Sequence, residues 1–138
     1  AIKERGQNKV MIYSAACSRG QEVYSLATFF HEHLKKYPEM SYEVWGSDID
    51  QESINIAKNG VYNFNEVKSI PQVYLSGNWQ RGTGAIARFA KIKNHIREKC
   101  FFGPANLLDL QPFLKNQKFL FCHSTILKSS SLNCILFI

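Results

Sequence analysis

In the first sixty residues, short apolar runs alternate with segments whose apolar residues recur at helical spacing. Residues 9–14 (KVMIYS) form one apolar run, which ends in a stretch of small, turn-prone residues. Residues 42–46 (YEVWG) form a second run of the same kind. Runs of this length and composition are typical of buried strands. The pattern therefore predicts two strands, each followed by a loop.

A helix is predicted after each strand. Beyond the first strand, these apolar residues fall at helical spacing: Val23, Leu26, Ala27, Phe30 and Leu34. Lys35, Lys36 and Pro38 then supply stop signals. Residues 52–59 (ESINIAKN) predict a short helix that Gly60 closes. This alternation favours a parallel sheet with right-handed crossovers, so the predicted fold class is α/β and Rossmann-like.

The pattern loosens after the second helix. Residues 61–99, with scattered aromatic side chains and the Gly-rich turn RGTG, predict a small, partly β insertion. Residues 99–102 and 118–122 predict the third and fourth strands of the main sheet. We expect a single domain, residues 1–138, whose end from residue 118 onward is degenerate or truncated. An incomplete sheet would leave an unpaired apolar edge, which favours self-association.

Composition narrows the function classes. No apolar run approaches the ~20 residues that span a bilayer, and residues 1–10 are not signal-like, so we expect a soluble, cytoplasmic protein without membrane insertion. The four cysteines have no metal-site or disulfide spacing, and we expect no metal. The net charge of +6 favours an acidic partner. Charge alone leaves nucleic acid open, but we expect none.

The loop after the first strand is the main candidate for ligand binding. Small residues within SAACSRGQE (residues 14–22), among them Ala15, Ala16 and Gly20, let a ligand approach the backbone, and the helix N-terminus offers free N–H groups. The loop lacks the GxGxxG fingerprint, and Arg19 and Gln21 crowd it. A ligand with nucleoside and amino-acid parts therefore suits the loop better than NAD does.

Two acids follow the second strand. Asp48 ends the strand, where Rossmann-like folds use an acid to accept hydrogen bonds from ribose hydroxyls. Asp50 is placed to cap the next helix. We assign ribose binding to Asp48 and the cap to Asp50. The alternative is that either residue merely caps the helix.

The loop sequence resembles that of a known family. SAACSRGQEVYSLA (residues 14–27) resembles the SAA-S-TGEE-PYS-A signature of CheR methyltransferases, which esterify glutamates on bacterial chemotaxis receptors. The resemblance continues through SDID (residues 47–50), A-x-x-G-x-Y (residues 57–62), RGTG and NLL (residues 106–108). It implies an S-adenosylmethionine-dependent protein-glutamate O-methyltransferase, with S-adenosylhomocysteine as product and a methyl-accepting chemotaxis receptor as substrate.

The resemblance also implies a set of cofactor-binding residues. These are Ala15, Ala16, Gly20, Glu22, Asp48, Asn106 and Leu107. In this set Ala16 and Glu22 lie at the methionine part of the cofactor, Asp48 at the ribose, and Asn106 with Leu107 at the adenine. Glu22 is also in the first helical turn, where the dipole stabilises a carboxylate that can meet the ammonium group. The alternative for Glu22 is a surface acid. No catalytic residue is assigned.

The resemblance is incomplete at both ends of the chain. The family's N-terminal helical domain has no counterpart before Val10, and residues 121–128 match the family's F-CRN-IYF stretch only loosely. Whether the chain is an active enzyme is therefore left open. The alternative is an inactive CheR-like remnant that binds S-adenosylmethionine or a receptor.

The insertion resembles the family's small β-subdomain, which in some members docks a receptor peptide. It contains five basic residues: Arg81, Arg88, Lys91, Lys93 and Arg97. A positive face formed by them would attract the acidic methylation region of a receptor. The alternative is that they are separate, solvated side chains.

Overall fold

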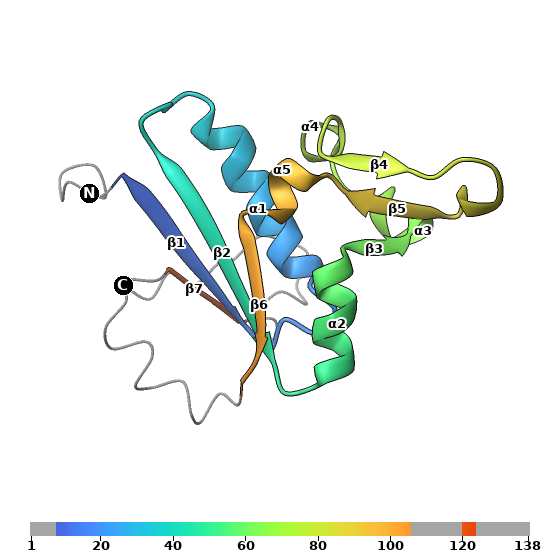
Figure 1. Cartoon of the computed structure of the whole chain (residues 1–138). Coiled ribbons are helices and arrows are strands. Elements are labelled where there is room, and N and C mark those ends of the chain that lie inside the picture. The colour runs from blue at the N-terminus through green and yellow to red at the C-terminus, as the bar shows by residue number, and fades with distance from the viewer. Residues whose placement is uncertain (1–7, 106–119, 124–138) are drawn as a thin grey trace.

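A four-stranded parallel sheet forms the centre of the molecule. The computed structural model describes residues 8–105 and 120–123 (Figure 1). The strands lie in the order β6-β2-β1-β7. Their bounds are β1 (Lys9–Ala15), β2 (Ser41–Asp48), β6 (Cys100–Pro104) and β7 (Leu120–His123). All neighbouring pairs are parallel, with Ile12 opposite Val44 and Leu120, and Val44 opposite Cys100.

Two helices connect the first strands and form the core with them. Helix α1 (Gln21–Leu34) follows β1, and α2 (Gln51–Asn59) follows β2. The buried strand residues Ile12 and Val44 pack in one cluster with Val23 and Ile54 of the helices. Each such side chain contributes roughly 1.5–3 kcal/mol when fully buried. The predicted α/β, Rossmann-like fold is confirmed.

The fourth predicted strand is present as β7, which pairs with β1. Among the described residues, β6 and β7 are the outer strands of this sheet. Residues 106–119 and 124–138, including the degenerate end, lie outside the described part of the chain. Self-association through a sheet edge stays a prediction. No helix among the described residues is long and apolar enough to cross a membrane.

The predicted insertion contains a second, antiparallel sheet between α2 and β6 (Figure 1). Its three strands lie in the order β3-β5-β4. The elements are β3 (Val61–Asn63), α3 (Phe64–Val67), α4 (Gln72–Leu75), β4 (Trp79–Arg81), the 3₁₀ turn η2 (Gly84–Ile86), β5 (Phe89–Ile92) and α5 (Asn94–Arg97). The Ile92 N–H donates to the Gly60 carbonyl at 2.9 Å, so the two ends of the small sheet meet.

Tyr24 of α1 lies where the two sheets approach each other. Its side chain is fully buried. Its ring makes edge contacts with Tyr62, Trp79 and Phe102 at centroid distances of 6.1, 6.2 and 5.5 Å. Its hydroxyl donates to the Ala57 carbonyl at 2.5 Å, so the polar end of the ring is satisfied. Tyr24 thus joins both sheets and α2 in one core.

Asn78 joins the inserted subdomain to α1 through buried polar contacts. It is 2% exposed, and its side-chain amide donates to Glu32 of α1 and to the Tyr74 carbonyl, both at 3.0 Å. Its side-chain oxygen lies 3.0 Å from the His95 ring nitrogen Nε2. One buried amide therefore links α1, α4 and α5.

We expect Asn78→Ala to lower the free energy of unfolding by about 1–3 kcal/mol, because several buried polar groups lose their partner. Asn55→Ala is the matched control, since exposed Asn55 makes only one side-chain hydrogen bond to Gln51 within α2. The control should change stability by less than about 0.5 kcal/mol. Urea unfolding measures both, and equal effects would contradict the role given to Asn78.

His31 of α1 is half-buried, with its ring 6.3 Å from Tyr42 and 5.0 Å from His95. The reason is that α5, a four-residue helix without a periodic pattern, packs beside α1. Burial lowers the pKa of His31, and the neighbouring His95, Lys35 and Lys99 add to this effect while Glu32 opposes it. His33, two residues further along α1, is exposed.

This lowered pKa predicts a pH dependence of stability. The neutral form of His31 is favoured in the folded state, so its contribution is present above the ordinary histidine pKa of ~6.5 and is lost as the pH falls through the lower folded value. We expect the wild-type chain to lose more stability between pH 7 and pH 5 than His31→Asn does. Urea unfolding at both pH values measures the difference, and parallel losses would contradict the assignment.

Candidate functional site

The loop between β1 and α1 lies at the carboxyl ends of the parallel strands. Ala16 and Ser18 both have a φ angle of 52°, in the left-handed region that non-glycine residues rarely adopt. Hydrogen bonds hold this conformation: the Cys17 N–H donates to the Ser47 carbonyl at 2.9 Å, and the Gly20 N–H donates to the Cys17 carbonyl at 3.0 Å. Backbone strain of this kind concentrates at ligand-binding sites.

Asp48 contacts this loop directly. One carboxylate oxygen accepts from the Ser18 N–H at 2.8 Å, and the other accepts from the Asp50 N–H at 2.9 Å. A carboxylate has about four acceptor positions, so two backbone N–H groups leave capacity for ligand hydroxyls. The tip of β2 therefore presents its acid beside the loop, as the sequence predicted.

Asp50 caps α2, as predicted, while ribose binding by Asp48 stays a prediction. Its side chain accepts from the Ser53 N–H at 3.1 Å and from the Ser53 hydroxyl at 2.6 Å. These hydrogen bonds lower the pKa of Asp50. The alternative in which Asp48 caps the helix is wrong, because the N-cap position belongs to Asp50.

Glu22 lies in the first turn of α1, on the other flank of the loop. It is half-buried, and its carboxylate accepts from the buried Ser14 hydroxyl at 2.7 Å. Glu22 is therefore not a fully exposed acid, and its contact with a ligand stays a prediction. Burial raises the pKa of the Cys17 thiol to about 12, and the charges of Asp48 and, to a smaller extent, Glu22 raise it further. Asp48 accepts from Ser18 of the loop and Glu22 accepts from Ser14 near the end of β1, so the two carboxylates flank the same loop.

Gly20 has a packing role. Its φ is 88°, and an added Cβ would lie 2.7 Å from the Ala57 Cβ and 3.1 Å from Phe102 Cε1. The absent side chain thus lets the start of α1 approach α2 and β6. Packing explains this glycine without reference to a ligand, and a contact between its backbone and the cofactor stays a prediction.

Of the remaining predicted residues, two lie within the described region and two lie outside it. Ala15 is buried at the end of β1, opposite Ser47 and His123, and Ala16 is half-buried in the loop. Asn106 and Leu107 lie outside the described residues.

Sequence reasoning missed the supporting residues of the loop. Ser14 binds Glu22, the Ser47 carbonyl holds the Cys17 N–H, and the Ser47 hydroxyl bonds the Tyr13 hydroxyl. Ser14 lies in the predicted loop segment SAACSRGQE, and Ser47 lies in the segment SDID. Their positions therefore indicated a place near the site, but their hydrogen-bond partners could be identified only from the structure.

The chain has the features of a Rossmann-like domain: a parallel sheet, a strained loop after the first strand and an acid at the tip of the second strand. Domains of this class bind their ligands at the carboxyl ends of the strands. Within this class, the model of the CheR methyltransferase SAM-binding domain matches residues 1–127. The chain belongs to the CheR methyltransferase family.

Individual relatives agree with the family match. The chain is 32% identical over 107 residues to a chemotaxis protein methyltransferase of Escherichia coli, covering 78% of the chain and 37% of that relative. It is 31% identical over 107 residues to one of Salmonella typhimurium, with the same coverage. It is 33% identical over 98 residues to chemotaxis protein methyltransferase 2 of Pseudomonas aeruginosa, covering 71% of the chain and 35% of that relative. The chain thus spans little more than a third of the length of these relatives.

The packing role of Gly20 gives a matched pair of variants. Gly77 has a similar φ of 80°, but nothing lies within 4 Å of a Cβ added there. We expect Gly77→Ala to cost about 1–2 kcal/mol of unfolding free energy for backbone strain alone, and Gly20→Ala to cost about 1–3 kcal/mol more for overlap with α2. Urea unfolding measures both, and equal losses would rule out the close contact.

Proposed function

We propose that this chain binds S-adenosylmethionine at the loop after β1 and transfers its methyl group to a glutamate carboxylate of a chemotaxis receptor. The observation that carries the proposal is the placement of Glu22 and Asp48 on the two flanks of one strained loop. Membership of the CheR family supports it, as do relatives whose names describe methyltransferases of chemotaxis.

The two acids suit the two polar ends of this ligand. Glu22 offers a carboxylate to the ammonium group of the methionine part, and Asp48 offers acceptors to the ribose hydroxyls. Ala15 and Ala16 are small, so the ligand can approach the backbone between these contacts. In this proposal Asn106 and Leu107 contact the adenine.

The chemistry requires positioning and no general base. A glutamate side chain has a pKa near ~4.3, so the receptor's nucleophile is already ionised at neutral pH. The S-adenosyl ligand supplies an activated methyl group on a sulfonium. As the new O–C bond forms, the C–S bond breaks, which leaves a methyl ester and S-adenosylhomocysteine without transfer of a proton. The protein holds the reactants in line, which can supply on the order of 7–11 kcal/mol.

The inserted β-subdomain is the proposed contact for the receptor. Arg88 and Lys91 are exposed on it, and the Arg81 guanidinium lies 3.9 Å from the centre of the Phe64 ring. Exposed cations attract an acidic methylation region and raise the rate of encounter more than the affinity.

Titration with S-adenosylhomocysteine tests cofactor binding. We expect saturable binding by the wild-type chain, and a dissociation constant about tenfold or more higher for Asp48→Asn, because hydrogen bonds from the ribose to a charged acceptor are lost. Asp50→Asn is the matched control, since it removes the same charge two residues away and keeps a good N-cap. Its dissociation constant should stay within about twofold of wild type. Equal effects of the two variants, or no saturable binding by wild type, would refute the assignment.

Transfer of a radiolabelled methyl group to a receptor cytoplasmic fragment tests catalysis separately. We expect base-labile methyl ester on the fragment, and less of it with Asp48→Asn at subsaturating cofactor. Binding of S-adenosylhomocysteine without any turnover would refute the catalytic part of the proposal and leave the binding part standing.

A further inference from the structure

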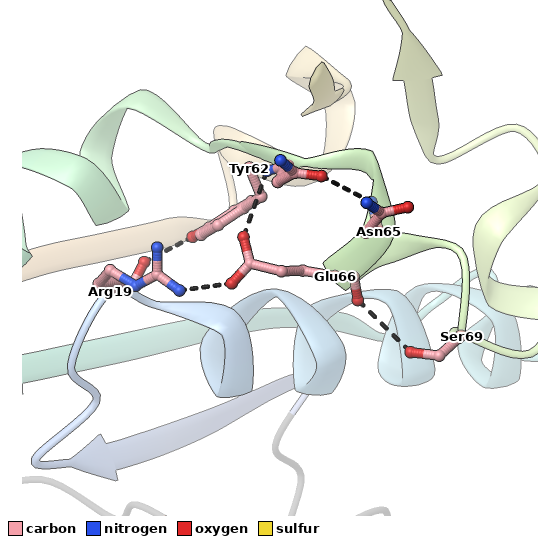
Figure 2. A network of polar contacts seen from close by, with 6 residues as sticks. Arg19, Tyr62, Asn65, Glu66 and Ser69 are labelled. Carbon is pink, nitrogen blue, oxygen red and sulfur yellow. Dashed lines mark hydrogen bonds and ion pairs between the residues drawn. The ribbon is translucent and has the colours of Figure 1, made fainter. Parts of the chain in front are cut away.

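The inserted subdomain contacts the candidate cofactor loop at two points. The Tyr62 hydroxyl, from β3, donates to the Arg19 carbonyl at 2.6 Å. The Arg19 guanidinium bonds the Glu66 carboxylate, from α3, at 2.5 Å. Figure 2 shows both contacts converging on Arg19, between the end of β1 and the start of α1. One residue of the loop is thus held through its backbone and through its side chain.

Glu66 is kept in place by its own helix. Its second carboxylate oxygen accepts from the Asn63 N–H at 3.2 Å, and the Asn63 side chain accepts from the Glu66 N–H, which completes a capping box. The Asn63 side chain also accepts from the Asn65 N–H at 2.9 Å. Its carbonyl accepts from the Ser69 hydroxyl at 3.4 Å (Figure 2). The carboxylate that meets Arg19 is therefore preorganised by α3.

Tyr62 is equally fixed. Its side chain is 3% exposed, and its ring lies 6.1 Å from Tyr24 and 5.8 Å from Trp79. Burial raises the pKa of Tyr62, so its hydroxyl remains protonated and acts as a donor at neutral pH. Ring packing fixes the position of the Tyr62 hydroxyl. The hydrogen bond from this hydroxyl fixes the position of the Arg19 carbonyl in the loop.

We infer that Tyr62 and the Arg19–Glu66 ion pair are positioning residues for the cofactor loop, so that the affinity for the adenosyl ligand depends on the inserted subdomain. The inference rests on the proposed function. The loop has two strained residues, Ala16 and Ser18, and strain persists only where the surroundings over-determine it. Ser47 and Asp48 hold the loop from the main sheet, and Tyr62 and Glu66 hold it from the subdomain.

The Arg19–Glu66 ion pair is exposed, so its effect on ligand binding can be distinguished from an effect on the stability of the whole fold. The Arg19 and Glu66 side chains are 42% and 37% exposed, and ion pairs this exposed contribute little to the stability of the whole fold. The effect on the conformation of the loop is different, because Glu66 and Tyr62 both hold the loop at Arg19. Loss of the pair should therefore change binding more than unfolding.

The test measures S-adenosylhomocysteine binding to Tyr62→Phe, Arg19→Gln and Arg19→Lys. We expect Tyr62→Phe to raise the dissociation constant about fivefold and Arg19→Gln about two- to fivefold, the size of one lost hydrogen bond or ion pair. Arg19→Lys keeps the charge and should restore most of the affinity. Lys9→Gln is the matched control, since it breaks an ion pair of the same 2.5 Å length, Lys9–Glu43, at the far end of β1. It should leave binding unchanged.

Amide hydrogen exchange in the absence of ligand provides a second readout. The Ser18 and Gly20 N–H groups are bonded within the site, and they should exchange faster in Tyr62→Phe and Arg19→Gln. The Ile54 N–H, bonded to the Asp50 carbonyl at 3.1 Å in α2, should be unaffected. This pattern would identify a local change of the loop.

The outcomes are distinguishable. Wild-type affinity in both Tyr62→Phe and Arg19→Gln would overturn the inference and leave the proposed function intact. Weaker binding accompanied by faster exchange at Ile54 would also overturn it, because the effect would then be global. Absence of binding by the wild-type chain would refute the proposed function, and the cofactor role of Tyr62 would fail with it, whatever the exchange rates.

Discussion

Two hydrogen bonds from the loop after β1 to the end of β2 determine the geometry of the site. The Cys17 N–H reaches the Ser47 carbonyl, and the Ser18 N–H reaches Asp48, so the turn that leaves β1 is held against the tip of β2. The direction of α1, the position of Glu22 on its first turn and the contact of Arg19 with the subdomain all follow from this attachment. These two hydrogen bonds also offset the strain of the left-handed backbone at Ala16 and Ser18.

Much of the main sheet could be predicted because its signals are local. The run at residues 42–46 lies inside β2, the helix predicted from Gln21 begins there, and Asp50 caps α2 as its chemistry suggested. Strand ends were less accurate for β6, which was predicted over residues 99–102 but pairs with β2 from Cys100 to Pro104. The approach of Asp48 to the loop also followed from a general rule, because acids at the ends of parallel strands share one edge of the sheet.

The subdomain contacts could not be predicted, for a physical reason. Helices α3, α4 and α5 have four residues each, too few for a periodic pattern to appear. The partners of Asn78 and Tyr62 come from distant parts of the chain, and no spacing rule relates them. Tyr62 stood inside a recognised A-x-x-G-x-Y segment, yet its role emerged only when its hydroxyl was seen beside Arg19. The places of Asn106 and Leu107 stay predictions.

The hydrogen bond that joins Ile92 to Gly60 affects how the chain reaches its folded state. Strands β2 and β6 are neighbours in the sheet but are separated in sequence by α2 and the whole insertion, so pairing them costs the entropy of closing a long loop. A small antiparallel unit whose ends already meet shortens that loop, because only the residues outside the unit remain to be ordered. Once the insertion is folded, the entropy cost of pairing β6 with β2 is therefore lower than the sequence separation of the two strands alone would give.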